Sequence, residues 1–218
     1  MASSGKIVDL RALLAERFPS LALTPNGCLT TGLPAFDQIA GGGIQKGAIT
    51  ELISPHTSSG SASFIAALIH AAHRDRYFLA LIDGHDSFDP QPLGNDLLRH
   101  LLWLRCQTTI QAIKSADLLL RDGNFPLVVI DLVLNPVHEI RKVPQTSWYR
   151  LQRLVESTST AFLVLTRFNT VSSAQLKLVL DNMWTLQTSR SQNAASYLHF
   201  RVTRAHGRSE QLRNILAG

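Results

Sequence analysis

The chain has 218 residues, of which 45% are hydrophobic and 17% charged, and its formal net charge is +5 at pH 7. This composition is typical of a folded protein with a sizeable core, and no apolar run approaches the roughly 20 residues of a membrane-spanning helix. Two cysteines, Cys28 and Cys106, are too few for a disulfide framework or a cysteine-rich metal site. We therefore expect neither a membrane protein nor a disulfide scaffold, and no resident metal.

Residues 1–28 are predicted to form a helical arm and a linker. Four apolar side chains recur at helical spacing between residues 6 and 18 and form one stripe. They are Ile7, Leu10, Leu14 and Phe18. Such a stripe needs a surface to pack on, which predicts docking on a partner subunit or self-association through the arm. The segment lacks the features of a secretion signal, which predicts a cytoplasmic protein.

Residues 29–218 are predicted to form one α/β domain, because strand-like and helical patterns alternate along them. The strand-like runs are 48–53, 77–83, 126–133 and 160–168. The helical patterns are 62–73, 93–103, 109–121, 146–157 and 173–182. This order predicts a mostly parallel central sheet flanked by helices. The run 196–204 alternates with period two, which predicts antiparallel strands at the C-terminal edge, followed by a basic tail.

The run from Ser54 to Ser63 follows a strand and precedes a helix, as a phosphate-binding loop does. Such a loop needs glycines that let backbone N–H groups converge on phosphate, a lysine for the outer phosphates and a hydroxyl for Mg²⁺. Here Gly60 is retained, but Ser61 replaces the lysine and Ala62 replaces the hydroxyl residue. The loop is also one residue longer than the motif. We therefore predict a degenerate nucleotide site that does not use ATP and Mg²⁺ as cofactors.

The run "VVID" ends at Asp131 and has the hydrophobic-then-acidic form of a Walker B strand. A carboxylate at this position either binds a metal through water or is a buried structural acid. The pattern does not decide between these two roles.

Several phrases in the same order resemble the RecA-fold recombinases over residues 29–205. They are "TTGLPAFDQIAGGGIQKGAITELISP", "ALIDGHDSFDP" and "TTIQAIKSADLLLRDGNFPLVVIDLV". The resemblance implies a RecA-like P-loop NTPase core. It also places His85 where the family has its water-activating glutamate, and Thr166 and Arg167 where it has an asparagine–glutamine pair that relays the state of ATP to a DNA-binding loop.

These departures remove phosphate neutralisation, the general base and the coupling element together, which predicts a chain that does not hydrolyse ATP. The alternative is a DNA-stimulated ATPase with a compensated site. In it, Lys46 or Arg167 replaces the lysine, His85 or Asp86 acts as base, and Asp131 holds Mg²⁺.

Within this fold, the opening phrase and the short chain look most like the ImuA-type mutagenesis proteins, with the SulA-like division inhibitors nearby. The resemblance to ImuA implies a non-catalytic accessory protein in damage-induced translesion synthesis. Its implied partners are a RecA-type recombinase and an inactive Y-family polymerase homologue. The resemblance to SulA implies a regulator that binds protein only, and this alternative stays open.

Basic residues cluster in two segments, which predicts contact with the backbone of DNA. The first surrounds an aromatic side chain and contains Arg141, Lys142, Trp148, Arg150 and Arg153. The second contains Arg190, Arg201, Arg204 and Arg208, in a C-terminal stretch with one acid, Glu210. The alternative interpretation is a solvated helix face and an interface.

Overall fold

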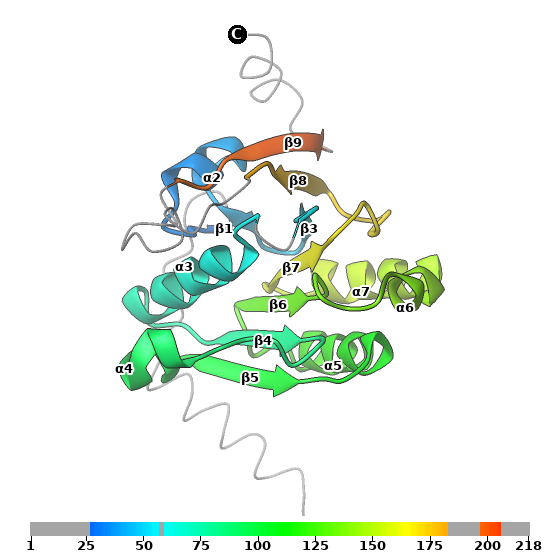
Figure 1. The fold of residues 1–218 in the computed structure, drawn as a ribbon, viewed down its shortest axis with the longest axis horizontal. Coiled ribbons are helices and arrows are strands. Elements are labelled where there is room, and N and C mark those ends of the chain that lie inside the picture. The colour runs from blue at the N-terminus through cyan, green and yellow to red at the C-terminus, as the bar shows by residue number, and fades with distance from the viewer. Residues whose placement is uncertain (1–26, 57–58, 183–196, 206–218) are drawn as a thin grey trace, which may run out of the picture.

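The computed structural model describes residues 27–56, 59–182 and 197–205. Their core is a seven-stranded sheet in the order β5-β4-β6-β7-β3-β8-β9. All its neighbouring strands are parallel except the pair β8 and β9. Figure 1 shows this sheet with β9 at one edge and β5 at the other. The fold is therefore the mostly parallel α/β architecture that the sequence predicts, with an antiparallel strand at its C-terminal edge.

The strands are short and largely buried, which explains their continuous apolar sequences. Their bounds are β3 Ile49–Ile53, β4 Leu79–Asp83, β5 Leu101–Arg105, β6 Leu127–Asp131, β7 Ala161–Thr166, β8 Leu176–Leu180 and β9 Phe200–Ala205. A separate antiparallel pair joins β1 Cys28–Leu29 to β2 Ile44–Gln45.

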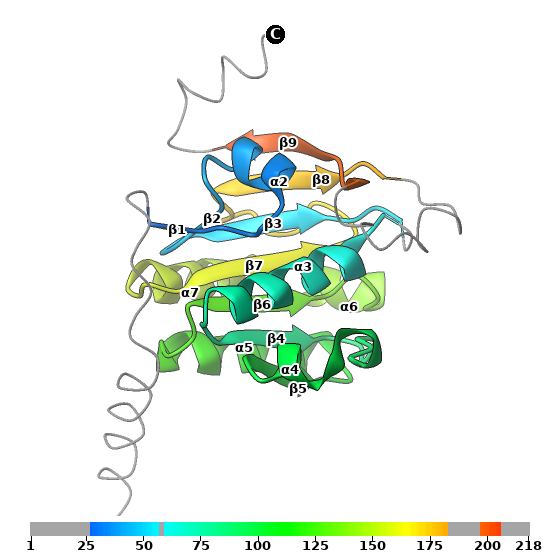
Figure 2. The same cartoon turned by 90° about the vertical axis from the view of Figure 1, so that its left-hand side faces the viewer.

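Helices cover both faces of the sheet (Figures 1 and 2). On one face lie α2 Pro34–Ile39, α3 Ser61–Arg74 and α4 Gly94–Leu98, the last preceded by the 3-10 turn η1 Gln91–Leu93. The other face carries α5 Thr109–Asp122, α6 Val137–Lys142 and α7 Gln145–Glu156. Side chains alternate between two apolar clusters along each strand, so that Leu81 and Val129 pack toward α3 while Ile82 and Ile130 pack toward α5 and α7.

Two predicted helices are wrong. In 93–103 the helix ends at Leu98, and residues Leu101–Arg105 form the edge strand β5 paired with β4. In 173–182 the chain forms β8, whose Leu178 and Leu180 are buried on one face. Both segments are rich in leucine, which fits the 3.6-residue period of a helix and the two-residue period of a strand. Pairing with a neighbouring strand therefore decides that they form strands.

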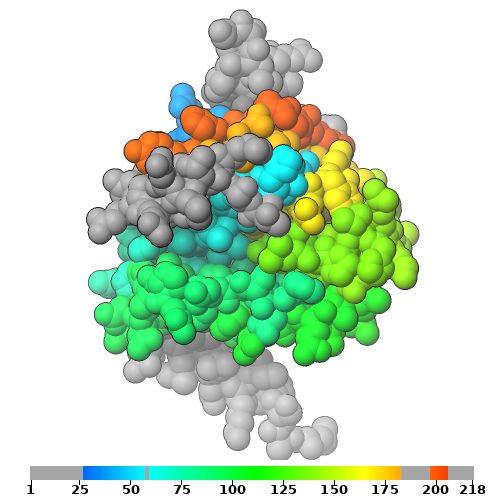
Figure 3. All heavy atoms as spheres, viewed as in Figure 1, coloured from blue at the N-terminus to red at the C-terminus, as the bar shows by residue number. Residues whose placement is uncertain are grey.

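The space-filling view in Figure 3 shows β9 and the segment containing β5 at opposite ends of the described core. No helix among the described residues is both long and apolar enough to cross a membrane.

Candidate functional site

The carboxyl ends of the parallel strands lie at one edge of the sheet, where ligands bind in open α/β folds. Ser54 follows β3, Gly84 follows β4, and Arg167 follows β7. Ile53 pairs with Thr166, and Asp83 pairs with Asp131, so the four strands end at nearly the same level. The residues that the sequence assigns to a degenerate nucleotide site therefore follow strands that end at the same edge of the sheet.

The loop after β3 is closed by its own hydrogen bonds. The buried Ser54 donates its backbone N–H to Thr166 O at 2.7 Å, and its hydroxyl to His56 O at 3.3 Å. His56 N donates to Ser59 Oγ, and Ser59 N donates to His56 O, both at 3.1 Å. Ser59 is fully buried, so its hydroxyl fixes the loop. Residues 57–58 lie outside the described part of the chain.

Helix α3 begins where the motif requires, but with different side chains. Gly60 adopts a left-handed conformation with φ of 98°, which favours glycine over residues with a Cβ, and α3 starts at Ser61. The N-cap residue Gly60 provides no side-chain cap for this helix start. Ser61 and Ala62 occupy its first turn, so that turn provides no cationic side chain for the outer phosphates.

Lys46 does not replace the missing lysine. It bridges to Ala161, the first residue of β7, whereas the loop follows the last residue of β3. A five-residue strand spans about 16 Å, so Lys46 lies at the opposite end of the sheet. Burial lowers the pKa of its amine. The alternative that used Lys46 is therefore wrong, while Arg167, half-buried beside the loop, remains the nearest cation predicted from the sequence.

The turn after β4 is organised by Asp83. Its buried carboxylate accepts from Phe88 N at 2.8 Å, and from His85 N and Trp103 Nε1 at 3.3 Å. Ser87 Oγ also donates to it at 3.3 Å. Because four donors converge on Asp83, it acts as the structural acceptor of the turn, and the His85 side chain is exposed beside it.

Asp86, the second alternative base, is already paired. Its carboxylate receives two donors from Arg105, including Nη2 at 2.7 Å, and Arg105 lies 5.2 Å from the Trp103 ring centre. The hydrogen bond from Arg105 lowers the pKa of Asp86 below its ordinary value. A carboxylate held in this way is a weaker proton acceptor, which argues against Asp86 as general base.

Asp131 lies directly opposite Asp83 in the register of β4 and β6. Its Oδ1 accepts from Val133 N at 2.9 Å. The pKa of Asp131 is raised to about 6, mainly by burial, with a smaller upward contribution from the Asp83 carboxylate and a downward one from the bond donated by Val133. Burial therefore makes the charged form of Asp131 less favourable than that of an ordinary aspartate, which favours the structural acid over a metal-linked carboxylate.

A close contact holds the turn after β4 against the loop after β6. Asn135 is buried, and its Nδ2 donates to Gly84 O at 2.8 Å and to Thr109 Oγ1 at 3.1 Å. A Cβ on Gly84 would lie 2.4 Å from Asn135 Oδ1. Glycine is required at 84 because no side chain fits in this approach.

The described side chains do not fit a nucleoside triphosphate with Mg²⁺. The helix start lacks the lysine and the metal-binding hydroxyl, Asp83 is occupied by four donors, and Asp86 is paired with Arg105. Among the residues that the structure describes, no group of three or more His, Cys, Asp or Glu side chains is placed to hold a metal.

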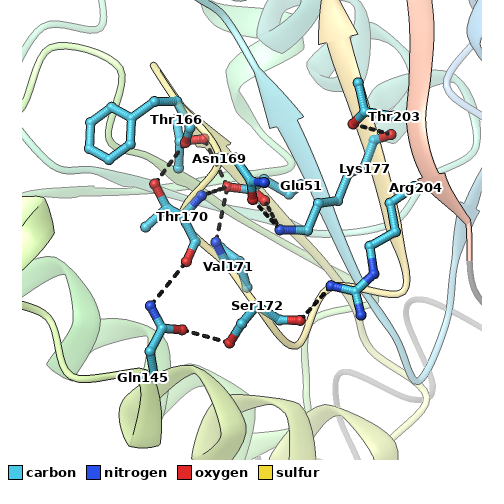
Figure 4. A network of polar contacts seen from close by, with 11 residues as sticks. Glu51, Gln145, Thr166, Asn169, Thr170, Val171, Ser172, Lys177, Thr203 and Arg204 are labelled. Carbon is cyan, nitrogen blue, oxygen red and sulfur yellow. Dashed lines mark hydrogen bonds and ion pairs between the residues drawn. The ribbon is translucent and has the colours of Figure 1, made fainter.

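A buried polar network lies beside the loop, and it was not predicted from the sequence (Figure 4). Glu51 on β3 forms an ion pair of 2.8 Å with Lys177 on β8, and both side chains are almost completely buried. Glu51 Oε1 also accepts from Thr166 Oγ1 at 3.1 Å. It accepts from Thr170 N at 2.8 Å and from Val171 N at 3.1 Å. One carboxylate therefore fixes the segment after β7 to the centre of the sheet.

Comparison with known proteins decides the family. The RecA N-terminal domain family matches residues 24–163, which is more than half of the chain. The chain belongs to this RecA family. Protein RecA of Clavibacter michiganensis subsp. michiganensis is 37% identical over 113 residues, and that of Chlorobaculum tepidum is 33% identical over 109 residues. Each match covers about half of this chain (50% and 48%) but only 31% of the relative.

In this RecA-family chain the Thr166–Arg167 segment no longer has the polar pair expected from the family resemblance. Thr166 instead donates its hydroxyl to Glu51, and the segment after it, residues 167–173, is short and held by Thr170 and Val171. No local signal in the sequence points to Lys177, because its partner Glu51 lies on a strand far away in the chain.

The two basic segments converge on residues 168–172 of the RecA-family core. The Arg141 guanidinium lies 5.6 Å from the Phe168 ring centre. Arg204 Nη1 donates to Ser172 O at 2.8 Å. Gln145, at the start of α7, accepts from the Ser172 hydroxyl at 2.6 Å. Arg141 and Arg204, far apart in the sequence, therefore border the same short segment.

Other predicted DNA-binding residues have different surroundings. Lys142 and Arg153 are exposed, whereas Arg150 is paired with Asp117 at 2.7 Å, and Arg201 lies 3.5 Å from Asp181.

Trp148 corrects the sequence interpretation, because its side chain is 0% exposed. It lies with Leu151 and Val155 on the buried stripe of α7, at spacings of three and seven residues. The indole therefore belongs to the core and does not face DNA. The predicted partner-binding residues Ile7, Leu10, Leu14 and Phe18 lie outside the described residues, as do Arg190 and Arg208.

Proposed function

We propose that this chain is a RecA-family accessory protein that does not hydrolyse ATP and acts as an adaptor in DNA repair, in damage-induced translesion mutagenesis. The observation that carries the proposal is the start of α3. The helix and its left-handed Gly60 are kept, but Ser61 and Ala62 replace the groups that neutralise phosphate and bind Mg²⁺. The fold of the nucleotide site is retained without the chemistry.

The turn after β4 supports the same proposal. The acids nearest to His85 have other partners, since Asp83 accepts four hydrogen bonds and Asp86 is paired with Arg105. General-base catalysis contributes about 10²- to 10⁴-fold to a rate. Transition-state stabilisation by a lysine is of comparable size. A chain lacking both has too little catalytic power for ordinary turnover.

DNA contact is the second part of the proposal. The guanidinium groups of Arg141 on α6 and Arg204 on β9 border residues 168–172. Two cations from distant parts of the sequence at one place suit a phosphate backbone. We further propose that the adaptor contacts a RecA-type recombinase or an inactive Y-family polymerase homologue.

The test is equilibrium binding of a fluorescent ATP analogue with Mg²⁺, with and without single-stranded DNA, followed by phosphate release from the same sample. The protein RecA of Clavibacter michiganensis provides the positive control. We expect no saturable nucleotide binding at millimolar concentration and no phosphate release. Turnover that Ala substitution of Arg167 or His85 abolishes would instead establish the ATPase alternative.

A further inference from the structure

An apolar groove lies on the face of the sheet away from α3, between α5 and α7. Its walls are formed by Ile110, Ile113 and Leu118 of α5, with Val143 and Leu151 on the other side. It encloses about 520 Å³, which is within the range of about 300 to 1,000 Å³ typical of binding pockets. We call this feature the α5–α7 groove.

The α5 wall of the groove exposes large apolar side chains. Ile110 is 63% exposed and Leu118 is 68% exposed, more than any other large hydrophobic residue among those described. They are eight residues apart on one helix, so their positions are about 12 Å apart along its axis. With Ile113 between them, apolar side chains occur along about two turns of this wall, and a partner helix docks through side chains at spacings of three, four and seven residues.

The rim of the groove is cationic. Lys114 and Lys142 are exposed, and neither forms an ion pair within the described part of the chain. The acid on the rim, Asp117, binds both Arg121 and Arg150. Although burial acts to raise the pKa of Asp117, these two hydrogen bonds lower it overall, so its charge is retained and offset by the arginines. The net rim charge therefore favours an acidic ligand.

The shape and chemistry of the groove favour a protein segment over nucleic acid. Single strands bind by stacking their bases on aromatic side chains, but the walls are aliphatic and the nearby Trp148 is fully buried. The chain's own segments outside the described residues do not complement the cationic rim either. Residues 1–26, 183–196 and 206–218 each contain one more basic than acidic residue.

We infer that the α5–α7 groove is the docking site for an acidic amphipathic helix of a partner protein. Its apolar side chains pack on Ile110 and Leu118, and its carboxylates face Lys114 and Lys142. This inference rests on the proposed adaptor function for the existence of a protein partner. The groove itself indicates where the partner docks. Its exposed isoleucine and leucine and its two exposed lysines indicate that the partner segment is apolar on one side and acidic.

The experiment selects ligands without assuming their sequence. Random 16-residue peptides displayed on phage are selected on the full chain and counter-selected on the double variant Ile110→Asp/Leu118→Asp. Selected sequences are synthesised with a fluorescent label, and their affinities are measured by anisotropy. Because both substituted side chains are exposed, the variant should keep the wild-type circular dichroism and melting temperature.

We expect acidic peptides with apolar residues at helical spacing. Their affinity should fall at least about tenfold on the double variant and on Lys114→Glu/Lys142→Glu. The matched control is Arg99→Glu, an exposed charge reversal directly after α4 across the sheet, which should leave the affinity unchanged.

Any of four results would overturn the inference. Selected peptides could bind the double variant as tightly as the wild type, or be neutral or basic. An oligonucleotide could lose affinity on Ile110→Asp/Leu118→Asp, which would assign the groove to nucleic acid. A synthetic peptide of residues 6–18 could bind as tightly as the selected ones, which would assign it to the chain's own arm. If no acidic peptide is selected, the docking inference fails, but the proposal that the chain does not hydrolyse ATP is unaffected. If phosphate is released, the proposed function fails, but the groove and its selected peptides are unaffected.

Discussion

Glu51 and Lys177 stand directly opposite each other in the register of β3 and β8, and their charged groups lie 2.8 Å apart in the interior. Burying two charges costs several kcal/mol for each ion, which their attraction offsets only with good geometry and further hydrogen bonds. Here the further bonds come from Thr166, Thr170 and Val171 to Glu51. The pair therefore fixes the segment after β7 as well as two neighbouring strands.

Replacing Lys177 by methionine should lower the free energy of unfolding by about 3 to 5 kcal/mol, because it leaves the buried Glu51 carboxylate without its counter-charge. Urea denaturation followed by circular dichroism measures this change. In Glu51→Gln/Lys177→Met the neutral amide still accepts from Thr170 N, and much of the stability should return. The exposed control Lys114→Met should change it by less than about 0.5 kcal/mol. Equal stability of Lys177→Met and wild type would contradict a structural role for the pair.

Asp131 should make stability fall as the pH rises from about 4 to 6. Its pKa is raised from 3.8 to about 6 in the folded state. In that window the folded chain binds more protons than the unfolded chain, so the slope of stability against pH is negative. The total loss is about 3 kcal/mol. Asp131→Asn should flatten the melting-temperature profile and stabilise the chain at pH 7.

The control for this profile is Asp96→Asn, which removes an exposed acid of α4. Its curve should follow that of the wild type between pH 4 and 6. An Asp131→Asn variant that is less stable than wild type at pH 7 would mean that the ionised carboxylate is required.

Restoring the motif residues should not restore ATP hydrolysis. Ser61→Lys/Ala62→Thr returns a lysine and a hydroxyl to the start of α3, but the loop keeps its His56–Ser59 bonds and the turn after β4 keeps Asp86 paired with Arg105. Phosphate release with and without single-stranded DNA should remain at the wild-type background. Hydrolysis by this double variant would show that the turn can supply a base.

The proposed DNA surface gives a salt signature. Each phosphate contact on single-stranded DNA contributes about 0.7 to the slope of log affinity against log salt concentration. Arg141→Gln and Arg204→Gln should each reduce that slope by about 0.7. Fluorescence anisotropy across a salt series measures it, with Arg99→Gln as the control. Trp148→Phe should leave the slope unchanged, and a slope that depends on Trp148 but not on the arginines would contradict this placement.

The fold was predictable where apolar runs are long and bounded by clear signals. The order β3, α3, β4, α5, β6, α7, β7 follows from alternating buried strands and amphipathic helices, and each lies close to its predicted range. Segments such as β5 and β8 were not predictable in the same way. Their leucines satisfy a helical and an extended pattern equally, and only the hydrogen bonds of β4 and β3 select the strand.

Only the part of the site whose residues are contiguous in the sequence was predictable. Ser61 and Ala62 lie at the helix start because the strand, loop and helix are contiguous in the sequence. Glu51 and Lys177 meet through sheet pairing across a long sequence separation, which no local pattern carries. Trp148 was misjudged because its basic neighbours on the exposed side of α7 hid the apolar stripe that buries it.

The close approach of Asn135 to Gly84 limits which residues evolution can place at position 84. A methyl group on residue 84 would meet the Asn135 amide oxygen at 2.4 Å, and that amide also bonds Gly84 O and Thr109. The same methyl group would lie 2.6 Å from the backbone oxygen of Asp131, so a smaller side chain at 135 would not make room for it. Any descendant that keeps this backbone therefore keeps glycine at 84, whatever residue it carries at 135.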